Sequence, residues 1–381
     1  MIRILKAFIP LLLATTLAAQ VFAQQQAGAP TFRSDTTEVL VPTLVTDQQG
    51  NVIFGLSAKD FIIRDNGVEQ TPQMDETFSS KPVSLVLAVQ TGGRAPEVIG
   101  SGCALQRNTN EFTRRPGKCK STLHGIALML ETFLDAPGSQ MALVSFDSAV
   151  KLRQDFSPNI ADVTAALDKL PGGDGDGAVL DAVQFSLNLL KHRPKNQRKV
   201  LVLIGEQNDH GSKTVTRDEA ARQIIASDIE VYMVAYPPDF TSAAESAAKL
   251  FGPGRSSIGN DPTGLPGPGS GASAVASFNL LGLLSLLHSS ASDMTSNVPQ
   301  SIANLTGGEY VLFHNEKGLD DALGKLANHA HNRYQLSFRV KNPEPGPHRL
   351  EVLLREGGGA QISARAGYWP LASSSQSPKP Q

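Results

Sequence analysis

The fold is decided by one stretch of the sequence, Val83-Ser84-Leu85-Val86-Leu87-Ala88-Val89-Gln90-Thr91-Gly92-Gly93-Arg94. Its apolar run ends abruptly in a pair of glycines, which is typical of a buried parallel strand that enters a loop at its carboxyl end. In open α/β sheets, ligands bind at the carboxyl ends of the strands. The stretch therefore predicts a core strand and also the edge of the sheet at which a functional site should lie.

Strands and helices alternate around this stretch, from residue 81 to residue 331. Further strands are predicted at residues 141–146, 150–154, 200–204, 229–236 and 310–313. Helices with apolar residues at helical spacing are predicted at residues 158–170, 180–190, 217–227 and 319–330. Ser157 is expected to cap the first of these helices, with Pro158 at its first position. The alternation predicts an α/β domain with a doubly wound, mostly parallel sheet.

Two β-like segments flank this domain, residues 24–80 and residues 332–370. In the first segment, Asn66-Gly67 stands between two short apolar runs and is the strongest short signal of a hairpin. The second segment alternates apolar and polar residues, as short antiparallel strands do. Because neither segment has enough strands to be stable alone, we predict one small β-sandwich made of both, with the α/β domain inserted between them.

Three other segments are not expected to belong to the folded core. Residues 1–23 have the pattern of a signal peptide, with two basic residues, an apolar segment and the cleavage site Val21-Phe22-Ala23. Residues 237–274 form a Gly/Pro-rich insertion, which is typical of a mobile loop. The tail at residues 371–381 is rich in Ser and Pro and is expected to be disordered.

Composition narrows the choice of partners. The chain has 381 residues and a net charge of −2, so there is no electrostatic reason to expect nucleic acid or an anionic membrane as partner. No segment after the signal peptide reaches the roughly 18 apolar residues that a transmembrane helix needs. We expect an exported protein, periplasmic or extracellular, without a transmembrane segment.

Cys103 and Cys119 are the two cysteines of the chain. In an oxidising compartment, two cysteines this close in sequence are expected to pair. Closing a loop of this size stabilises a fold by about 3 kcal/mol in the chain-entropy model. The alternative is a pair of free buried thiols.

Several short motifs follow one another in a fixed order. They are Val45-Thr46-Asp47 with Gly50, Gly55-Leu56, Asp60-Phe61, Asp65-Asn66-Gly67, the residues 142–147, the residues 305–310 and the residues 364–369. In this order the chain resembles the von Willebrand factor type A-related proteins abundant in Acidobacteria, over nearly all of its mature length. The resemblance implies an α/β domain of the von Willebrand factor type A kind with flanking β segments. Such folds commonly serve as binding modules.

The resemblance also locates a metal-ion-dependent adhesion site, whose residues this chain replaces. The Asp-x-Ser-x-Ser positions hold Gln90, Gly92 and Arg94, Gly177 stands in place of the ligand Thr, and Glu206 stands in place of an Asp. A divalent cation needs several oxygen ligands in a fixed geometry. We therefore expect a degenerate site that binds no metal, and no cofactor.

Two substitutes for the metal remain open. In one, Asp174 and Asp176 join Glu206 in a non-standard cation site, unless they form a solvated acidic loop before a helix. Alternatively, Arg94 pairs with Glu206 in the vacated position. His329 and His331 lie at the end of the last predicted helix and are expected to be surface residues.

Two classes of function follow. The first is a non-enzymatic protein-binding or adhesion-type module of the cell envelope, which contacts a protein or another envelope macromolecule through the loops at the strand ends. The second is a hydrolase that uses the carboxylates of Asp174, Asp176 and Glu206, because a fold alone does not exclude catalysis. The chain carries neither a Gly-x-Ser-x-Gly nor a His-Glu-x-x-His motif, and the sequence favours the binding module.

Overall fold

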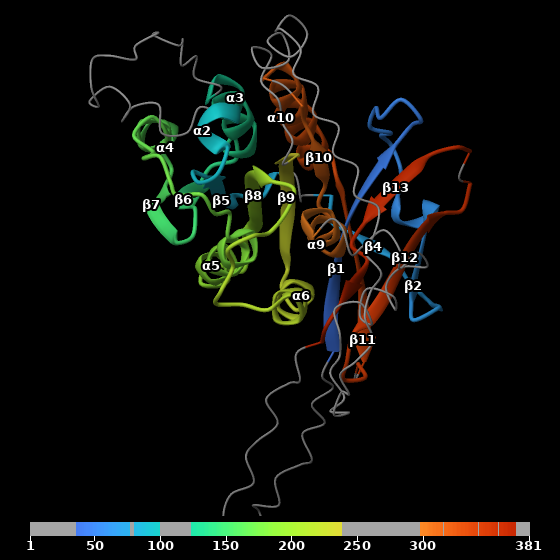
Figure 1. The fold of residues 1–381 in the computed structure, drawn as a ribbon. Coiled ribbons are helices and arrows are strands. Elements are labelled where there is room, and N and C mark those ends of the chain that lie inside the picture. The colour runs from blue at the N-terminus through green and yellow to red at the C-terminus, as the bar shows by residue number, and fades with distance from the viewer. Residues whose placement is uncertain are drawn as a thin grey trace, which may run out of the picture. The chain divides into compact units, whose positions relative to one another are not determined.

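The computed structural model of the chain describes residues 36–76, 80–99, 123–237, 298–314, 316–341, 343–356 and 358–370. The predicted signal peptide, Cys103, Cys119 and the predicted tail lie outside these residues, and so does the Gly/Pro-rich insertion apart from Pro237. The described residues form one six-stranded sheet and two four-stranded sheets (Figure 1).

The six-stranded sheet has the strand order β10-β9-β8-β5-β6-β7. Its strands are β5 (Val83–Gln90), β6 (Gln140–Phe146), β7 (Val150–Ser157), β8 (Arg198–Glu206), β9 (Ile229–Tyr236) and β10 (Tyr310–Leu312). Neighbouring strands pair in parallel, except that β6 and β7 form an antiparallel pair. Every residue of β5 and β9 is buried, as expected of strands covered on both faces. The prediction of a mostly parallel α/β sheet is confirmed.

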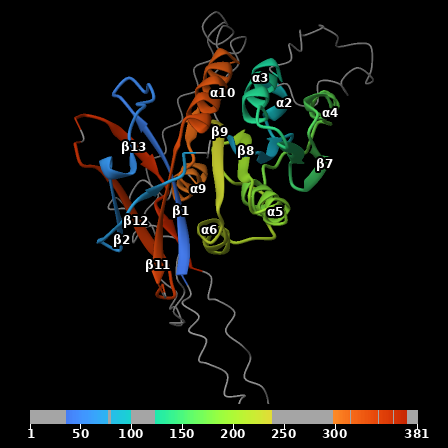
Figure 2. The ribbon, with the colours of Figure 1, turned by 180° about the vertical axis from the view of Figure 1, so that it is seen from behind.

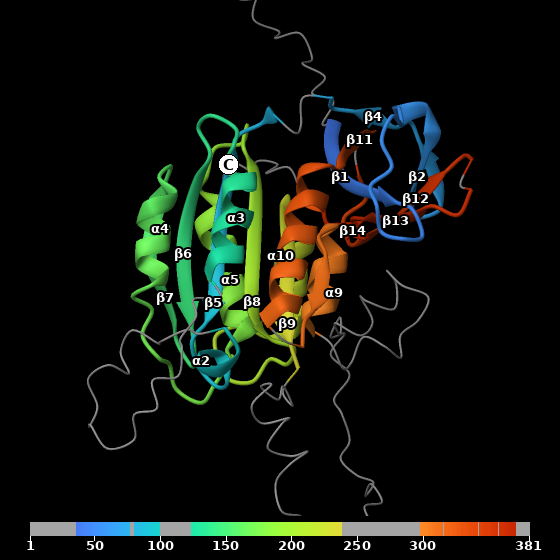
Figure 3. The same ribbon diagram turned by 90° about the horizontal axis from the view of Figure 1, so that it is seen from above.

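Helices cover both faces of this sheet, and each face has its own apolar core. One face carries α2 (Ala95–Val98), α3 (Leu123–Phe133), α4 (Ile160–Leu167) and α10 (Glu316–His331). The other carries α5 (Val179–Lys191), α6 (Arg217–Ile225) and α9 (Val298–Thr306). Figure 3 shows α3 and α10 in front of the strands and α5 behind them. Helices α3 and α9 were not predicted. None of the helices in the described part of the chain is long and apolar enough to cross a membrane.

The start of α4 differs from the prediction. Ser157 is the last residue of β7, where it pairs with Met141, so it does not cap the helix. Asn159 is the N-cap residue, and its side chain accepts a hydrogen bond from the Ala161 N–H at 3.1 Å. The strand pairing extends the β conformation through Ser157, and the helix therefore begins at Ile160.

The two four-stranded sheets combine strands from both ends of the chain. Their orders are β13-β1-β11-β4 and β14-β12-β2-β3. The amino-terminal strands are β1 (Thr36–Thr46), β2 (Phe61–Asp65), β3 (Val68–Gln70) and β4 (Gln73–Met74), with the 3₁₀ turn η2 (Ala58–Asp60) before β2. The carboxyl-terminal strands are β11 (Tyr334–Lys341), β12 (His348–Leu354), β13 (Gln361–Ala364) and β14 (Gly367–Tyr368). Strand β2 pairs with β12, β1 with β13 and β4 with β11.

Both sheets bury side chains in one apolar cluster, which includes Phe61, Ile63, Leu336 and Phe338. The predicted hairpin at Asn66-Gly67 is confirmed: both residues have positive φ angles, 48° and 84°, as a tight hairpin turn between β2 and β3 requires. That these strands make up a single sandwich interrupted by the α/β domain stays a prediction.

Strands of the terminal segments contact the α/β domain beside α6 (Figures 1 and 2). The buried Arg365 donates hydrogen bonds to the carbonyl oxygens of Ile225 and Ser227, at 2.7 and 2.9 Å. The Trp369 N–H donates to the same Ile225 carbonyl at 3.1 Å. Because Ile225 ends α6, these bonds satisfy carbonyl groups that have no partner within the helix.

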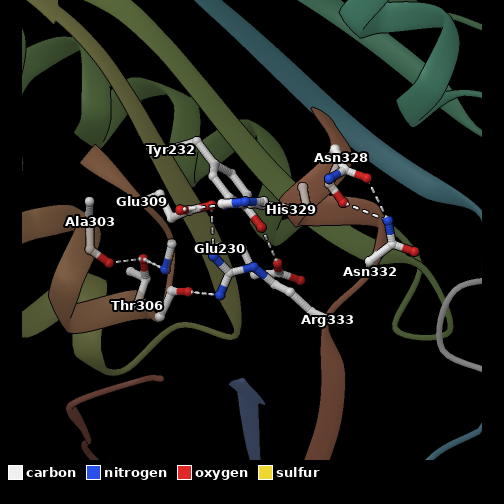
Figure 4. A network of polar contacts seen from close by, with 12 residues as sticks. Glu230, Tyr232, Ala303, Thr306, Glu309, Asn328, His329, Asn332 and Arg333 are labelled. Carbon is white, nitrogen blue, oxygen red and sulfur yellow. Dashed lines mark hydrogen bonds and ion pairs between the residues drawn. The ribbon is translucent and has the colours of Figure 1, made fainter. Parts of the chain in front are cut away.

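His329 is buried, so the prediction of a surface histidine is wrong at this position. Only 2% of its surface is exposed. Its Nδ1 lies 2.9 Å from Glu309 Oε1 (Figure 4). Its Nε2 lies 3.1 Å from the carbonyl oxygen of Gly50. His331, two residues further along and at the end of α10, is part-exposed and lies 4.0 Å from Asp135.

Arg333 extends this group of polar residues into the interior. Its side chain is fully buried, 3.3 Å from Glu309, and its guanidinium lies over the ring of Tyr232 and donates to the Gly307 carbonyl. Burial alone would raise the pKa of Glu309, but the hydrogen bond with His329 and the charge of Arg333 outweigh burial and lower it. Tyr232 in turn donates to Glu230, near the amino end of β9 (Figure 4). This network therefore holds α10 against β9, away from the carboxyl ends of the strands.

Candidate functional site

Gln90, the last residue of β5, lies at the centre of the predicted site. It is fully buried. Its Oε1 accepts a hydrogen bond from the Glu206 N–H at 2.7 Å, and its Nε2 donates to the Gly92 carbonyl at 3.4 Å. Because β5 and β8 are parallel neighbours, their carboxyl ends bring Gln90 and Glu206 together.

Glycines surround the Gln90 amide. A Cβ atom at Gly177 would lie 2.7 Å from Gln90 Nε2, and one at Gly205 would lie 2.8 Å from Gln90 Oε1. Cβ atoms essentially never approach other heavy atoms this closely. The amide of Gln90 therefore fills the space that side chains at these two positions would need.

Glu206 is 4% exposed, and both of its carboxylate oxygens have partners. Oε1 accepts a hydrogen bond from the Arg94 backbone N–H at 3.5 Å, and Oε2 lies 2.5 Å from His210 Nε2. The nearby Tyr236 is buried, and its pKa is raised mainly by burial and further by the charge of Glu206, while the charge of Arg94 acts in the opposite direction. An ion pair between the Arg94 guanidinium and Glu206 stays a prediction.

His210 is the functional candidate that the sequence analysis missed. Its side chain is 43% exposed, so it connects the buried Glu206 carboxylate with the protein surface. Its Nδ1 accepts from the Gly177 N–H at 3.2 Å, which leaves Nε2 to donate to Glu206 in the neutral ring. Burial lowers the pKa of His210, but the hydrogen bond to Glu206 and the charges of Glu206 and Asp176 outweigh it, so the pKa is raised above 6.5.

Backbone hydrogen bonds close the loops over this site. The Gly173 N–H donates to the Thr91 carbonyl at 2.8 Å, and the Gly93 N–H donates to the Asp174 carbonyl at 2.6 Å. A Cβ atom at Gly92 would lie 2.2 Å from the Asp176 carbonyl oxygen. The loop after β5 is therefore held against the loop at residues 172–177 with no room for a side chain at position 92.

Asp174 holds this loop in shape through its carboxylate, and Asp176 through its backbone N–H. The Asp174 carboxylate accepts from the Ser148 hydroxyl, from the Ser148 N–H at 3.0 Å and from the Asp176 N–H at 3.1 Å. These hydrogen bonds, the Ser148 hydroxyl foremost, lower the pKa of Asp174. Within the described residues, no three His, Cys, Asp or Glu side chains are grouped so that they could hold one metal ion.

Hydrogen bonds with residues of α5 fix the loop that carries His210. The buried Asp181 accepts hydrogen bonds from the backbone N–H groups of Lys213, Thr214 and Val215, at 2.9, 3.1 and 3.2 Å. Asp209 accepts from the Leu180 N–H at 3.1 Å. The segment from β8 to α6 is thus an ordered part of the site.

Comparison with protein families gives one match. The model of the von Willebrand factor type A domain matches residues 107–208. This stretch contains a von Willebrand factor type A domain. It includes the loop at residues 172–177 and Glu206, and the described α/β fold around it, with its mixed and mostly parallel sheet, is of the same kind. Comparison with curated protein sequences finds no match.

Solved structures similar to this chain are distant. An aerotolerance-related membrane protein from Bacteroides fragilis is 13% identical with a TM-score of 0.35, covering 65% of this chain and 98% of its own. The PilB minor pilin from Streptococcus sanguinis is 13% identical with a TM-score of 0.37, covering 66% and 62%. A von Willebrand factor type A protein from Catenulispora acidiphila is 7% identical with a TM-score of 0.37, covering 88% and 75%. We rest no conclusion about function on similarities at this level.

Proposed function

We propose that this chain is an exported, non-enzymatic protein-binding module whose contact surface lies at the carboxyl ends of its central strands and works without a metal ion. The observation that carries this proposal is the position of the Gln90 side chain. Its amide fills the space beside Gly177 and Gly205 and is hydrogen-bonded to the Glu206 backbone.

The residues at the adhesion-site positions do not fit a divalent cation. Mg²⁺ prefers a nearly octahedral set of oxygen ligands at about 2.0–2.1 Å. Gly92 and Gly177 supply no side-chain oxygen, and the Oε1 of Gln90 already accepts the Glu206 N–H. Glu206, the remaining carboxylate, is hydrogen-bonded to His210 and to the Arg94 backbone.

The proposed contact surface is polar. Asp174 and Lys213 are exposed, and His210 is half exposed, on loops whose backbones are fixed by hydrogen bonds. A preorganised loop loses little conformational entropy when it binds, which favours recognition of a partner. The chemistry fits a partner surface with charged and hydrogen-bonding groups, and the resemblance to binding modules agrees with a protein in that role.

Isothermal titration calorimetry tests the absence of metal. With millimolar Mg²⁺ or Mn²⁺ we expect no saturable heat and no change in melting temperature. A metal ion that bound the folded state would stabilise it and raise the melting temperature. Saturable binding at one ion per chain, lost in a Glu206→Gln variant, would overturn this part of the proposal.

Site-specific photo-crosslinking tests the surface. A photoreactive amino acid at Lys213, on the strand-end loop, should form an adduct with an envelope protein in cells. The same amino acid at the exposed Lys191, at the other end of α5, serves as the matched control. Arg94→Gln should reduce the adduct at position 213 without changing the circular dichroism spectrum. Equal adducts at both positions, or none at position 213, would overturn the proposal.

The alternative function is a hydrolase that uses Asp174, Asp176 and Glu206. One observation favours it: Glu206 and His210 form a hydrogen-bonded acid–base pair at the surface, which is a geometry that proton transfer requires. A turnover that is abolished in Glu206→Gln and His210→Ala variants, with binding of the partner retained, would favour this alternative over the binding module.

A further inference from the structure

A cavity of about 310 Å³ lies at the amino ends of β8 and β9. The segment from Lys195 to Lys199 forms one wall, the segment from Ser227 to Glu230 another, and Leu40, Pro42 and Arg365 of the terminal β segments complete it. Its volume is within the range of pockets for small molecules, about 300–1,000 Å³. The cavity is at the opposite ends of these strands from Gln90 and Glu206, so it is separate from the proposed contact surface.

The cavity has more positive than negative groups. Five cationic side chains line it: Lys81, Lys195, Arg198, Lys199 and Arg365. Its two anionic side chains, Asp228 and Glu230, already have cationic partners, since Arg365 lies 3.3 Å from Asp228 and Arg198 lies 3.4 Å from Glu230. Lys81 pairs with Asp75, outside the lining. Among the described residues, Lys195 and Lys199 form no ion pair.

Lys199 is the more buried of these two lysines. It is the second residue of β8, partly covered by its neighbours, whereas Lys195 is exposed at the rim. Burial lowers the pKa of Lys199, Asp228 raises it, and the positive charge of Lys195 lowers it further. Two ammonium groups therefore line one cavity with like charges, and the carboxylate that acts on Lys199, that of Asp228, already pairs with Arg365.

We propose that this cavity binds a small molecule through an oxyanion group, carboxylate or phosphate, held by Lys195 and Lys199. An oxyanion relieves the repulsion between the two ammonium groups and accepts charge-assisted hydrogen bonds from both. Asn196 also lines the cavity, and its side chain supplies a polar group for the rest of the ligand.

Binding of simple anions tests the proposal. The full-length protein is titrated with inorganic phosphate and, separately, with malonate, at constant ionic strength because salt screens exposed charges. We expect saturable binding of at least one of them, and the stronger of the two identifies the ligand class. Lys199→Gln should weaken it by about tenfold, as loss of one hydrogen bond to a charged group does. Lys195→Gln, at the exposed rim, should also weaken it and cannot act through loss of the fold.

A matched control and a chemical readout locate the site. Lys151→Gln removes the same charge from the exposed β7, at the far edge of the sheet, and should leave the affinity unchanged. The bound anion should slow reductive methylation of Lys195 and Lys199, but not of Lys151, in a mass-spectrometric assay. No saturable binding of either anion, or equal weakening in all three variants, would overturn the proposal. Since neither probe touches the strand-end loops, this outcome leaves the proposed binding function untouched.

Discussion

Substituting Gly92 by Ala should test whether the loops over the candidate site are packed as the structure shows. The added methyl group would lie 2.2 Å from the Asp176 carbonyl oxygen and 2.8 Å from that of Asp174. Both are backbone atoms, so no side chain can turn aside to make room. The loop after β5 and the loop at residues 172–177 must therefore separate.

The expected destabilisation follows from the bonds that separation breaks. Two inter-loop hydrogen bonds, Gly93 N–H to Asp174 O and Gly173 N–H to Thr91 O, contribute about 1 kcal/mol each. Overpacking adds about 1–3 kcal/mol. Loss of glycine's freedom in the unfolded chain offsets about 0.4–1 kcal/mol. We expect Gly92→Ala to lower the free energy of unfolding by about 2–4.6 kcal/mol.

Gly175→Ala, in the facing loop, is the matched control, because a Cβ atom there meets nothing within 4 Å. It should stabilise the protein slightly, by about 0.4–1 kcal/mol at most, through the unfolded chain alone. Urea denaturation followed by circular dichroism measures both variants, with an unchanged m value as evidence of a two-state comparison. If Gly92→Ala is within 1 kcal/mol of Gly175→Ala, the loops are not closed as described.

Three other predictions concern stability and covalent structure. The pKa of Glu309 is lowered from its ordinary value of 4.5. The ionised Glu309 therefore contributes fully to the free energy of unfolding above pH 4.5, and this contribution is lost as the pH falls through the folded-state pKa. In urea titrations between about pH 5 and pH 3, the Glu309→Gln variant, though less stable at pH 7, should lose less stability than the unmodified protein. Cys103 and Cys119 should be paired, so that the intact mass rises by two hydrogens on reduction, whereas full alkylation of the unreduced protein would contradict this. Deletion of residues 24–78 should expose the carboxyl-terminal strands to hydrogen exchange and aggregation, and a soluble truncation with these strands still protected would show that the two segments fold independently.

The strands of the α/β domain could be predicted because their signal is local. The runs Val83–Gln90 and Ile229–Tyr236 are apolar at all but one or two positions, and every residue in both is buried. The hairpin at Asn66-Gly67 was equally predictable, because the positive φ angles are a property of those two residues. Helix α4 was placed two residues early, since its start depends on how far β7 pairs with β6.

The details of the site could not be predicted, because they depend on contacts between distant parts of the chain. The sequence identified Gln90, Gly177 and Glu206 as altered positions, but not that the first fills the space beside the second. His210 carries no local signal, since its role depends on the carboxylate of Glu206, four residues before it, and on the Gly177 backbone. His329 was expected at the surface, but it is buried and in hydrogen-bond contact with the carbonyl of Gly50, 279 residues away.

The residues at positions 90, 92, 177 and 206 of the candidate site depend on one another physically. A threonine at position 177 would collide with the Gln90 amide, whereas a serine at position 92 would collide with the backbone of the facing loop whatever residue stands at position 90. Replacing Gln90 by Asp would shorten the side chain by one methylene group and draw the acceptor away from the Glu206 N–H, and a buried donor left unsatisfied costs about 1–3 kcal/mol. A metal ligand introduced at position 90, 92 or 177 would therefore disturb its neighbours. The present arrangement, with the Gln90 amide and the Glu206 carboxylate in the interior and the part-exposed His210 over them, is a packed structure in its own right. This is why we propose that recognition of a partner takes place on the surface of these loops.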